Sequence, residues 1–532
     1  MRKTLAIIGT GATVLAMSTL TTATAVGDDG NHGRTGPLPG GYKNLVVIYE
    51  ENHSFDNLLA GWGTVGKDRV GKGAVSQVAQ DGRAYGCLLQ NDVNLTSPGP
   101  LAATCTDAAH GVPSSAFTNA PFLIDSIIPA TATTCPAEGA YYPNGVLNGQ
   151  GLPGGCTEDL VHRFYQEQYQ INGGRQNRYV TGSDAVGLTM GRYDTTQLPI
   201  YRYLHSKGAP NYVVADRFFQ AAFGGSFLNH QFLISARAPL DASAGGLGAK
   251  FSVLDANGMV KKYPLYTPTR TDVVDGQLTR TCADPLRNDP VAACGAYAVN
   301  TVQPSSLPAA ASGAKIPLID DAAFPNIGDR LSAKGIPWAW FSGGWDNAEA
   351  GHPGPTFQYH HQPFNYFAAY APGQPGRAHL QDETKFFSAA ATGTLPAVSF
   401  VKPYGTENEH PGYASEHTGS DHLVDLLQAV MSGPQAKDTL VVVTYDEFGG
   451  QADHVAVPTV DAWGPGTRIP AMLISARMQH SGVDSTQYDT TSILATIEQA
   501  WGLAPLSSRD AGVNPLTNAI RAGTSGGQGG NG

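Results

Sequence analysis

The chain has 532 residues and carries 33 Lys and Arg against 44 Asp and Glu, a formal net charge of −11. This acidic balance argues against nucleic acid or an anionic membrane as the principal partner, because both attract basic surfaces. The length is long for one domain, although a large α/β core with insertions can reach it.

The N-terminus has the three parts of a secretory signal. A charged start, Met1–Lys3, precedes an apolar stretch, Leu5–Met17, and the small residues Ala23–Ala25. We expect a signal peptide over 1–25 and a secreted or periplasmic protein; an uncleaved anchor is the alternative, which the short, interrupted apolar region disfavours. No later segment approaches the roughly 18 apolar residues of a membrane span, so we expect no stable membrane insertion. Residues 26–41 are polar and rich in Gly and Pro, which indicates a flexible lead-in.

Short apolar runs predict buried strands at Asn44–Tyr49, Tyr212–Ala215, Pro337–Phe341, Ala397–Val401, Thr439–Tyr445 and Ile469–Ile474. Helical patterns between them predict helices at Asp159–Gln170, Leu198–Ser206, Ala323–Ala333, His417–Met431 and Asp489–Trp501. Strands that alternate with helices favour an α/β fold with a mostly parallel sheet. We place one domain over 42–505, with long insertions at about 72–155 and 236–317, and a partly disordered tail over 506–532.

Six cysteines fit an exported protein, which can form and keep disulfides. The absence of a Cys-x-x-Cys pair argues against a zinc ribbon. Many connectivities are possible, and we favour sequential pairing because each bridge would then staple one irregular insertion, although only proximity supports this choice. The pairs would be Cys87 with Cys105, Cys135 with Cys156, and Cys282 with Cys294.

Two acidic clusters follow apolar strands that lie far apart in the sequence. Glu51 and Asn52 come after the first strand, and Asp446 and Glu447 after the run Thr439–Tyr445. Ligands of open α/β sheets bind beyond the carboxyl ends of the strands, and oxygen ligands of this kind suit a divalent cation. The two glycines after Glu447 allow the backbone to turn, so that neighbouring carboxylates can converge. The alternative is that these acids cap loops or pair with arginines.

Ser226 follows two glycines, which allow the backbone to approach a ligand and expose the hydroxyl. A nucleophilic serine needs activation by a base or a metal. Leu228 removes the Gly-x-Ser-x-Gly elbow of esterases, and an ordinary turn serine is the alternative.

Histidines gather in polar loops at Tyr359–Pro363 and Glu407–Pro411. Imidazole titrates near neutrality, so these side chains suit phosphate contacts or proton donation, although a lone histidine is usually a surface or packed side chain. No Gly-x4-Gly-Lys-Ser/Thr loop occurs, which argues against nucleotide hydrolysis by that route.

In chain order, these segments make the protein resemble the secreted bacterial phosphoesterases that unite phospholipase C of the non-haemolytic type with an AcpA-like acid phosphatase, within the alkaline phosphatase superfamily. The matching pieces are Glu51–Asp56, His110, Gly225-Ser226 with Asn229, His360–Phe364, Asn408–Pro411 and Thr444–Glu447 with Asp453–Val455. The resemblance implies an alkaline-phosphatase-like three-layer sandwich, with helices on both faces of the central sheet.

The resemblance also implies one divalent metal ion, which could be calcium, magnesium, manganese or zinc, with Ser226 beside it as nucleophile. The implied ligands are Glu51, Asn52, Asp446 and Glu447. The implied phosphoryl contacts are His110, His360, His361 and His410, with His410 or His360 as the acid that protonates the leaving oxygen.

We therefore expect an exported, metal-dependent acid phosphatase that hydrolyses small phosphomonoesters through a phosphoserine on Ser226. The alternative is a phospholipase C that cleaves phosphodiesters such as phosphatidylcholine. Ser226 replaces the usual Thr of that branch, Gln451-Ala452 replace an aromatic pair, and the chain ends soon after Trp501, where that branch commonly has further domains. A Ser-His-Asp carboxylesterase and a non-catalytic exported binding protein are more distant alternatives. The sequence does not indicate an oligomeric state.

Overall fold

The computed structural model describes most of the chain between residues 36 and 524. The described residues are 36–88, 102–128, 130–131, 133, 157, 159–183, 186–239, 298–299, 301–312, 315–412 and 414–524. All of them belong to one unit, Thr35–Gly532. The predicted signal peptide, most of the lead-in and four of the cysteines lie outside the described residues; these cysteines are Cys135, Cys156, Cys282 and Cys294.

The core is an eight-stranded sheet with strand order β15-β14-β16-β1-β17-β18-β10-β19. The strands are β1 (Asn44–Glu50), β10 (Asn211–Ala215), β14 (Trp338–Ser342), β15 (Leu380–Asp382), β16 (Val398–Lys402), β17 (Thr439–Tyr445), β18 (Ala471–Ser475) and β19 (Gly482–Asp484). All neighbours pair in parallel except at β18, which is antiparallel to both β17 and β10. The prediction of a mostly parallel sheet is confirmed.

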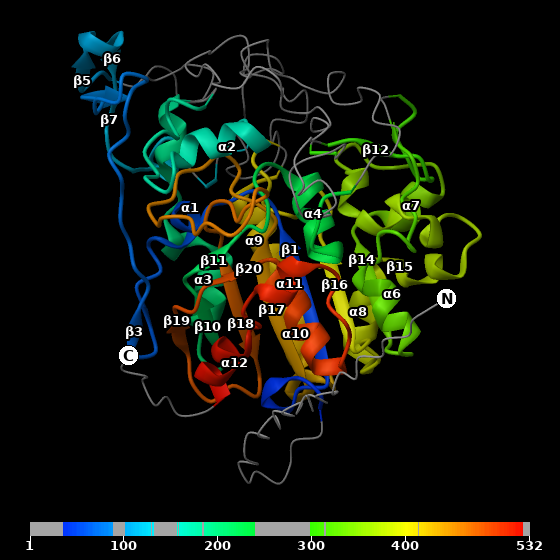
Figure 1. Cartoon of the computed structure of the whole chain (residues 1–532). Helices are drawn as coiled ribbons and strands as arrows, with labels where there is room; N and C mark the ends of the chain where they lie inside the picture. The colour runs from blue at the N-terminus through cyan, green and yellow to red at the C-terminus, as the bar shows by residue number, and fades with distance from the viewer. Residues whose placement is uncertain are drawn as a thin grey trace, which may run out of the picture. The chain divides into compact units, whose positions relative to one another are not determined.

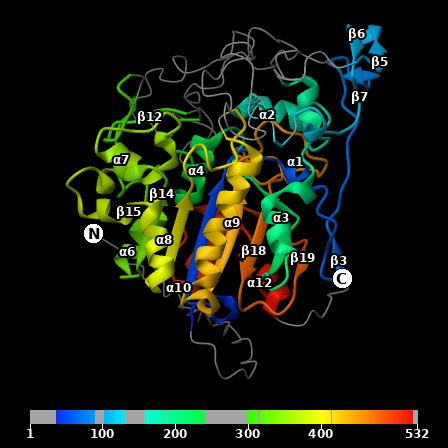
Figure 2. The ribbon, with the colours of Figure 1, turned by 180° about the vertical axis from the view of Figure 1, so that it is seen from behind.

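Helices cover both faces of this sheet, which gives three layers. Figure 1 shows α4 and α10 on one face of the strands, and Figure 2, seen from behind, shows α3, α8 and α9 on the opposite face. The helices are α1 (Phe55–Leu59), α2 (Phe164–Ile171), α3 (Pro199–Leu204), α4 (Ser226–Ser235), α6 (Ile327–Ala333), α7 (Trp345–Glu349), α8 (Glu383–Thr392), α9 (Glu416–Ser432), α10 (Thr491–Trp501), α11 (Ser508–Gly512) and α12 (Thr517–Thr524). Among the described residues, none of the helices combines the length and apolar character needed to cross a lipid bilayer.

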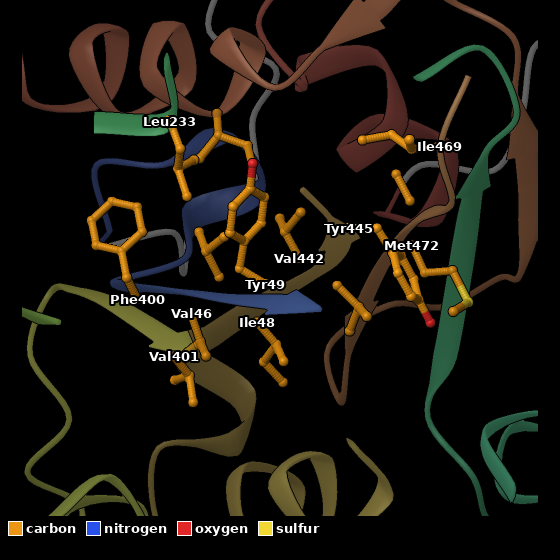
Figure 3. Close-up of a cluster of buried hydrophobic side chains, with 14 of the residues drawn as sticks. Val46, Ile48, Tyr49, Leu233, Phe400, Val401, Val442, Tyr445, Ile469 and Met472 are labelled. Carbon is orange, nitrogen blue, oxygen red and sulfur yellow. The ribbon is translucent and has the colours of Figure 1, made fainter. Parts of the chain in front are cut away.

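The centre of the sheet is buried on both faces. Every residue of β1 and β17 is buried, which explains why their sequences are continuous apolar runs rather than alternating ones. Figure 3 shows side chains of β1, β16 and β17 packed with Leu233 of α4 and Ile469. Fully burying one such side chain contributes roughly 1.5–3 kcal/mol, so this core holds the strand ends in a fixed arrangement.

The expected strands and helices all occur, with ends shifted by a few residues. Helix α4 was not predicted; all ten of its residues are buried, and its sequence therefore lacks the alternation of apolar and polar faces that marks a surface helix. Residues 506–524, which the sequence placed in a tail, contain α11 and α12.

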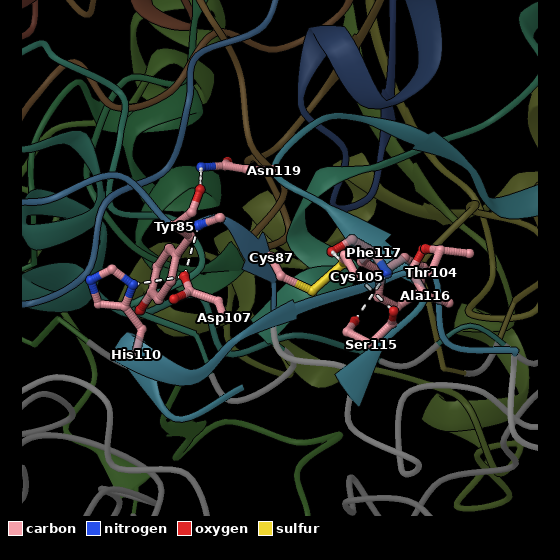
Figure 4. The surroundings of a disulfide bond; sticks show 11 residues. Tyr85, Cys87, Thr104, Cys105, Asp107, His110, Ser115, Ala116, Phe117 and Asn119 are labelled. Atoms are coloured by element: carbon pink, nitrogen blue, oxygen red, sulfur yellow. Dashed lines mark hydrogen bonds and ion pairs between the residues drawn. A yellow bond between two sulfur atoms is a disulfide. The ribbon is translucent and has the colours of Figure 1, made fainter. Parts of the chain in front are cut away.

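Short paired strands lie outside the central sheet, some of them in the two insertions. These are β2 (Thr64–Val65), β3 (Asp68–Arg69), β4 (Cys87–Leu88), β5 (Cys105–Asp107), β6 (Val112–Ser115), β7 (Phe117–Thr118), β8 (Phe122–Leu123), β9 (Gly191–Arg192), β11 (Phe218–Phe219), β12 (Gln303–Pro304), β13 (Lys315–Ile316) and β20 (Tyr488–Asp489). A disulfide joins Cys87 of β4 to Cys105 of β5 (Figure 4), as the sequential pairing predicted.

Candidate metal centre

The two acidic clusters meet at the carboxyl ends of β1 and β17. These strands pair in parallel, with Glu50 opposite Tyr445, so the residues that follow each strand emerge side by side. The backbone N–H of Asn52 donates a hydrogen bond of 3.1 Å to Asp446 Oδ1, which joins the clusters directly. The sheet therefore unites segments that are almost 400 positions apart (|i−j| = 394).

Ser226 lies between the clusters. Its Oγ is 3.3 Å from Glu51 Oε2, 3.4 Å from Asn52 Oδ1 and 3.3 Å from Glu447 Oε1. One hydroxyl proton cannot serve three acceptors at once, so these oxygens form an electron-rich cage rather than an ordinary hydrogen-bonding environment. Ser226 itself is only 6% exposed.

The cage concentrates negative charge in a buried environment. Burial and the nearby Glu51 raise the pKa of Asp446 to about 8, and burial and Asp446 raise the pKa of Glu447 well above its ordinary value. Asp446 Oδ2 is buried and has no hydrogen-bond partner among the described residues. A divalent cation would satisfy this oxygen and offset the repulsion, so the donor set fits a hard, oxygen-ligated ion.

Glu51 uses its two oxygens differently. Oε2 faces Ser226, whereas Oε1 is 2.5 Å from Lys402 Nζ and 2.9 Å from His361 Nε2. Burial alone would raise the pKa of Glu51, but His361 and Lys402 hold it well below its ordinary value. The carboxylate is thus ionised and has one oxygen directed at the cage.

A different ligand set, Glu51 with His230 and His361, also brings one atom from each residue within 4.8 Å of the others. We favour the oxygen cage, because an ion bound among the histidines would compete with Lys402 for Glu51 Oε1.

Two further clusters have spacing suited to a metal, but other partners already hold them. Asp56 and Asp453 both bind the guanidinium of Arg468, at 3.0 and 3.1 Å, and Asp56 also binds Arg192. A cluster of Glu383, Glu407 and His422 contains a 3.1 Å ion pair between His422 and Glu383. Arginines in the first cluster and a histidine in the second balance the carboxylate charge that a metal ion would otherwise balance.

A short chain of hydrogen bonds orients Asn52. The Nδ1–H of His410 donates to the carbonyl of Pro411 at 2.6 Å, which leaves Nε2 to accept from Asn52 Nδ2 at 2.8 Å. The amide oxygen of Asn52 is thereby turned toward Ser226. Asn52 also adopts a left-handed backbone conformation with φ of 61°, which Asn tolerates better than most residues.

The loop that presents Ser226 is fixed from several sides. Asn229 accepts from the backbone N–H of Ala222 at 3.0 Å and donates to its carbonyl at 3.1 Å. Glu167 accepts the backbone N–H of Gly224 at 2.6 Å and that of Thr467 at 2.7 Å. Gly224 has φ of +89°, and a Cβ there would lie 2.8 Å from the backbone of α2, so only glycine fits.

Three of the four predicted histidines lie at this centre. His361 contacts Glu51, and the His360 ring packs against His361 with centroids 4.6 Å apart. His410 is bonded to Asn52. Burial lowers the pKa of all three, well below its ordinary value for His360 and to about 3 for His410, so these last two imidazoles are neutral near pH 7.

His110 lies elsewhere, and its inclusion in the site needs correction. Its Nδ1 is 2.7 Å from Asp107, and its ring packs edge-on against Tyr85 beside the Cys87–Cys105 bridge (Figure 4). Both views of the ribbon place the hairpin of β5 and β6 at the periphery, away from β1 and α4 (Figures 1 and 2). The structure gives it no contact with any predicted ligand.

Sequence reasoning missed three side chains at the centre. His162 Nε2 is 3.3 Å from Glu447 Oε1, and burial lowers the pKa of His162 to about 4. The Nδ1–H of His230 donates to the carbonyl of Ser226 within α4 at 2.8 Å, and the His230 ring stacks on His361. Lys402 was recognisable only as a charged residue that ends an apolar strand.

Comparison with known proteins gives a family. The model of the Phosphoesterase family matches residues 42–504. Non-specific phospholipase C6 of Arabidopsis thaliana is 30% identical over 164 residues, 25% of this chain and 31% of that protein. Non-hemolytic phospholipase C of Pseudomonas aeruginosa is 26% identical over 210 residues, 33% of this chain and 29% of that protein. Phospholipase C B of Mycobacterium tuberculosis is 22% identical over 423 residues, 71% of this chain and 67% of that protein.

The chain thus spans about a third of the length of the first two relatives. Among solved structures, a 2-O GAG sulfatase aligns with a TM-score of 0.29 and 11% identity over 65% of this chain and 72% of that one. A protein of the alkaline phosphatase superfamily from Vibrio parahaemolyticus aligns with a TM-score of 0.23 and 12% identity, over 35% of this chain and 50% of that one. These TM-scores are too low to support an argument, so we assign the fold from the strand order of this chain and not from the alignments.

Proposed function

Because the chain belongs to the Phosphoesterase family, we propose that it is a metal-dependent hydrolase of phosphoric esters that uses Ser226 as its nucleophile. The observation that carries this proposal is the position of Ser226 Oγ, within 3.4 Å of oxygens from both acidic clusters. The carbonyl and carboxylate oxygens around it suit one divalent ion held by Glu51, Asn52, Asp446 and Glu447. Bound there, the ion would supply positive charge that favours the serine alkoxide and offsets charge on the phosphoryl oxygens.

The chain's own residues position the reacting groups. Ser226 begins α4, so its Oγ and the first backbone N–H groups of that helix face the same space, which favours an anion. In the first step the Ser226 oxygen bonds to phosphorus, the bond to the leaving oxygen breaks, and phosphoserine forms. Water then attacks the same phosphorus, phosphate leaves, and the serine recovers its proton.

A neutral imidazole is suited to carry the proton between these steps. It can accept the proton of the Ser226 hydroxyl and return it to the leaving oxygen, so that protons balance. We assign this role to His360 rather than His410, because both ring nitrogens of His410 already have partners. His410 instead orients Asn52.

We further propose that the preferred substrates are small phosphomonoesters. The support is burial: the four proposed ligands and the three predicted histidines around the nucleophile are at most 8% exposed, which suits a phosphoryl group with one small substituent. Cleavage of phosphodiesters by a phospholipase C activity is the second candidate, and the phospholipases among the relatives favour it. Export through the N-terminal signal stays a proposal that rests on residues 1–25.

Paired chromogenic substrates separate the two candidates. We expect faster turnover of p-nitrophenyl phosphate than of p-nitrophenylphosphorylcholine, loss of activity in EDTA, and recovery with a divalent ion. Much faster turnover of the choline diester would replace the first candidate with the second. Activity that survives chelation would exclude the metal-dependent reaction, and cleavage of a carboxylic ester without phosphate under the same conditions would favour a carboxylesterase.

A second measurement tests the nucleophile. Brief incubation of the protein with ³²P-labelled phosphate monoester, followed by acid quenching, should label the wild-type protein and not Ser226→Ala. Ser206→Ala is the matched control, because Ser206 is exposed and its hydroxyl donates to the carbonyl of Tyr203 in the preceding turn. Equal turnover in Ser226→Ala would refute the assignment, and no turnover in either form would indicate a binding protein.

A further inference from the structure

Lys402 is a buried cation that ends β16, directly beside β1. Its Nζ donates to the carbonyl of Tyr49 at 2.9 Å and to that of Glu50 at 3.2 Å, and lies 2.5 Å from Glu51 Oε1. Two of the three N–H donors of this ammonium group thus bond to the strand end that delivers the first proposed ligand, and its charge lies against the carboxylate of that ligand.

This contact leaves the other oxygen of Glu51 for the cage. Lys402 and the cage lie on opposite oxygens of one carboxylate, so the lysine and an ion in the cage need not compete. Lys402 is 0% exposed, and water does not screen its charge as it would at the surface.

The charges of the three carboxylates at the centre determine what Lys402 contributes. When ionised, Glu51, Asp446 and Glu447 bring three negative charges, one more than a divalent ion supplies. The resulting surplus would oppose a phosphate, which brings further negative charge at neutral pH. A fixed lysine on Glu51 removes the surplus.

We propose that Lys402 acts through Glu51 as a charge-balancing residue, which neutralises the ligand set so that an anionic phosphoryl group can enter. This inference rests on the proposed function. If Lys402 only tied β16 to β1, its removal would lower ion affinity and phosphate affinity together. A charge-balancing lysine predicts opposite effects: removal of its charge makes the cage more attractive to a cation and less attractive to an anion.

The test measures two affinities by isothermal titration calorimetry on the full chain. Calcium, magnesium, manganese and zinc are each titrated into metal-free protein, and inorganic phosphate is then titrated into protein loaded with the ion that wild type binds most tightly. For Lys402→Met we expect ion affinity equal to or above that of wild type, and phosphate affinity lower by about ten- to a hundredfold. For Lys402→Arg, which keeps the charge, we expect phosphate affinity within about fivefold of wild type.

Lys385→Met is the matched control, because Lys385 forms an exposed 3.3 Å ion pair with Asp346, and both affinities should equal those of wild type. Parallel loss of ion and phosphate affinity in Lys402→Met, or unchanged phosphate affinity, would overturn the inference. If Lys402→Met does not fold, Lys402→Gln is measured by the same titrations, since it keeps donors for the carbonyl groups without the charge. Wild-type protein that binds no ion would instead refute the proposed function.

Discussion

Gly449 offers a direct way to disturb the metal centre without changing a ligand. It follows Glu447 by two positions, has φ of +61°, and a Cβ built on it would lie 2.2 Å from the backbone oxygen of Asn52. Gly449→Ala should therefore push apart the two acidic clusters where they touch. Its backbone N–H also donates to Glu447 Oε2 at 2.6 Å, so any movement reaches a second ligand.

The magnitude has two parts. A left-handed backbone costs a residue with a Cβ roughly 1–2 kcal/mol. Restoring ordinary contact of 3.4 Å from 2.2 Å requires a shift of 1.2 Å against a backbone atom. Metal ligands tolerate displacements of only about 0.2 Å, so we expect ion affinity to fall by about a hundredfold, with a loss of roughly 3 kcal/mol in the free energy of unfolding.

Two other glycines separate strain from displacement. Gly63 has φ of +83° and Gly71 does not, and neither would place a Cβ within 4 Å of a neighbour. We expect Gly63→Ala to lose only the strain energy and Gly71→Ala to lose nothing, with wild-type ion affinity in both. Chemical denaturation gives the stabilities, and calorimetric titration of the ion gives the affinities. If Gly449→Ala is well folded and binds the ion as tightly as Gly63→Ala does, the contact between the clusters does not shape the site.

Three further substitutions test the surrounding structure. Glu167→Gln puts an amide donor opposite a backbone donor in the serine loop, which should cost roughly 1–3 kcal/mol of stability and lower kcat while leaving ion affinity unchanged. Burial and Asp510 raise the pKa of Glu498 from 4.5 to about 9, so the folded protein holds a proton that the unfolded chain releases, and stability should fall as pH rises through this range. Glu498→Gln should flatten that decline and gain roughly 1–2 kcal/mol near pH 8 in denaturation experiments; an unchanged slope would contradict the assignment. Arg468→Met leaves the buried Asp453 without its counter-charge and removes one of the two arginines that bind Asp56, so it should cost roughly 3–5 kcal/mol, whereas the surface variant Arg83→Met should cost almost nothing.

The sheet was predictable because its strands are buried on both faces. Short continuous apolar runs such as Thr439–Tyr445 are typical of buried strands, and the helical patterns between them indicate the fold class. Helix α4 escaped prediction for the related reason that burial on all sides removes helical periodicity. The two glycines before Ser226 marked it as a candidate residue, but the sequence did not indicate that Ser226 begins a helix.

The meeting of the two acidic clusters was predictable, and the side chains that surround them were not. Carboxylates after buried strands have a position that the sheet itself constrains, whereas the histidines lie on loops whose paths depend on tertiary packing. His110 and His162 show the difference: both occupy irregular segments, and the disulfide-linked hairpin carries one to the periphery while packing before α2 brings the other to Glu447. No local pattern distinguishes them.

The strand order explains how this centre can tolerate long insertions. Strands β16, β1 and β17 are neighbours, and their carboxyl ends supply in turn a lysine, a carboxylate with an amide, and a pair of carboxylates. The entropic cost of closing a loop rises only slowly with the length of the loop. Inserted segments between these strands therefore change stability little as long as the strands still pair. Ser226 is the component that the sheet does not position directly, and its loop is held instead by Asn229 and Glu167. Changes in the insertions should therefore affect the nucleophile before they affect the ligands, which means that kcat should fall in such variants while ion affinity is retained.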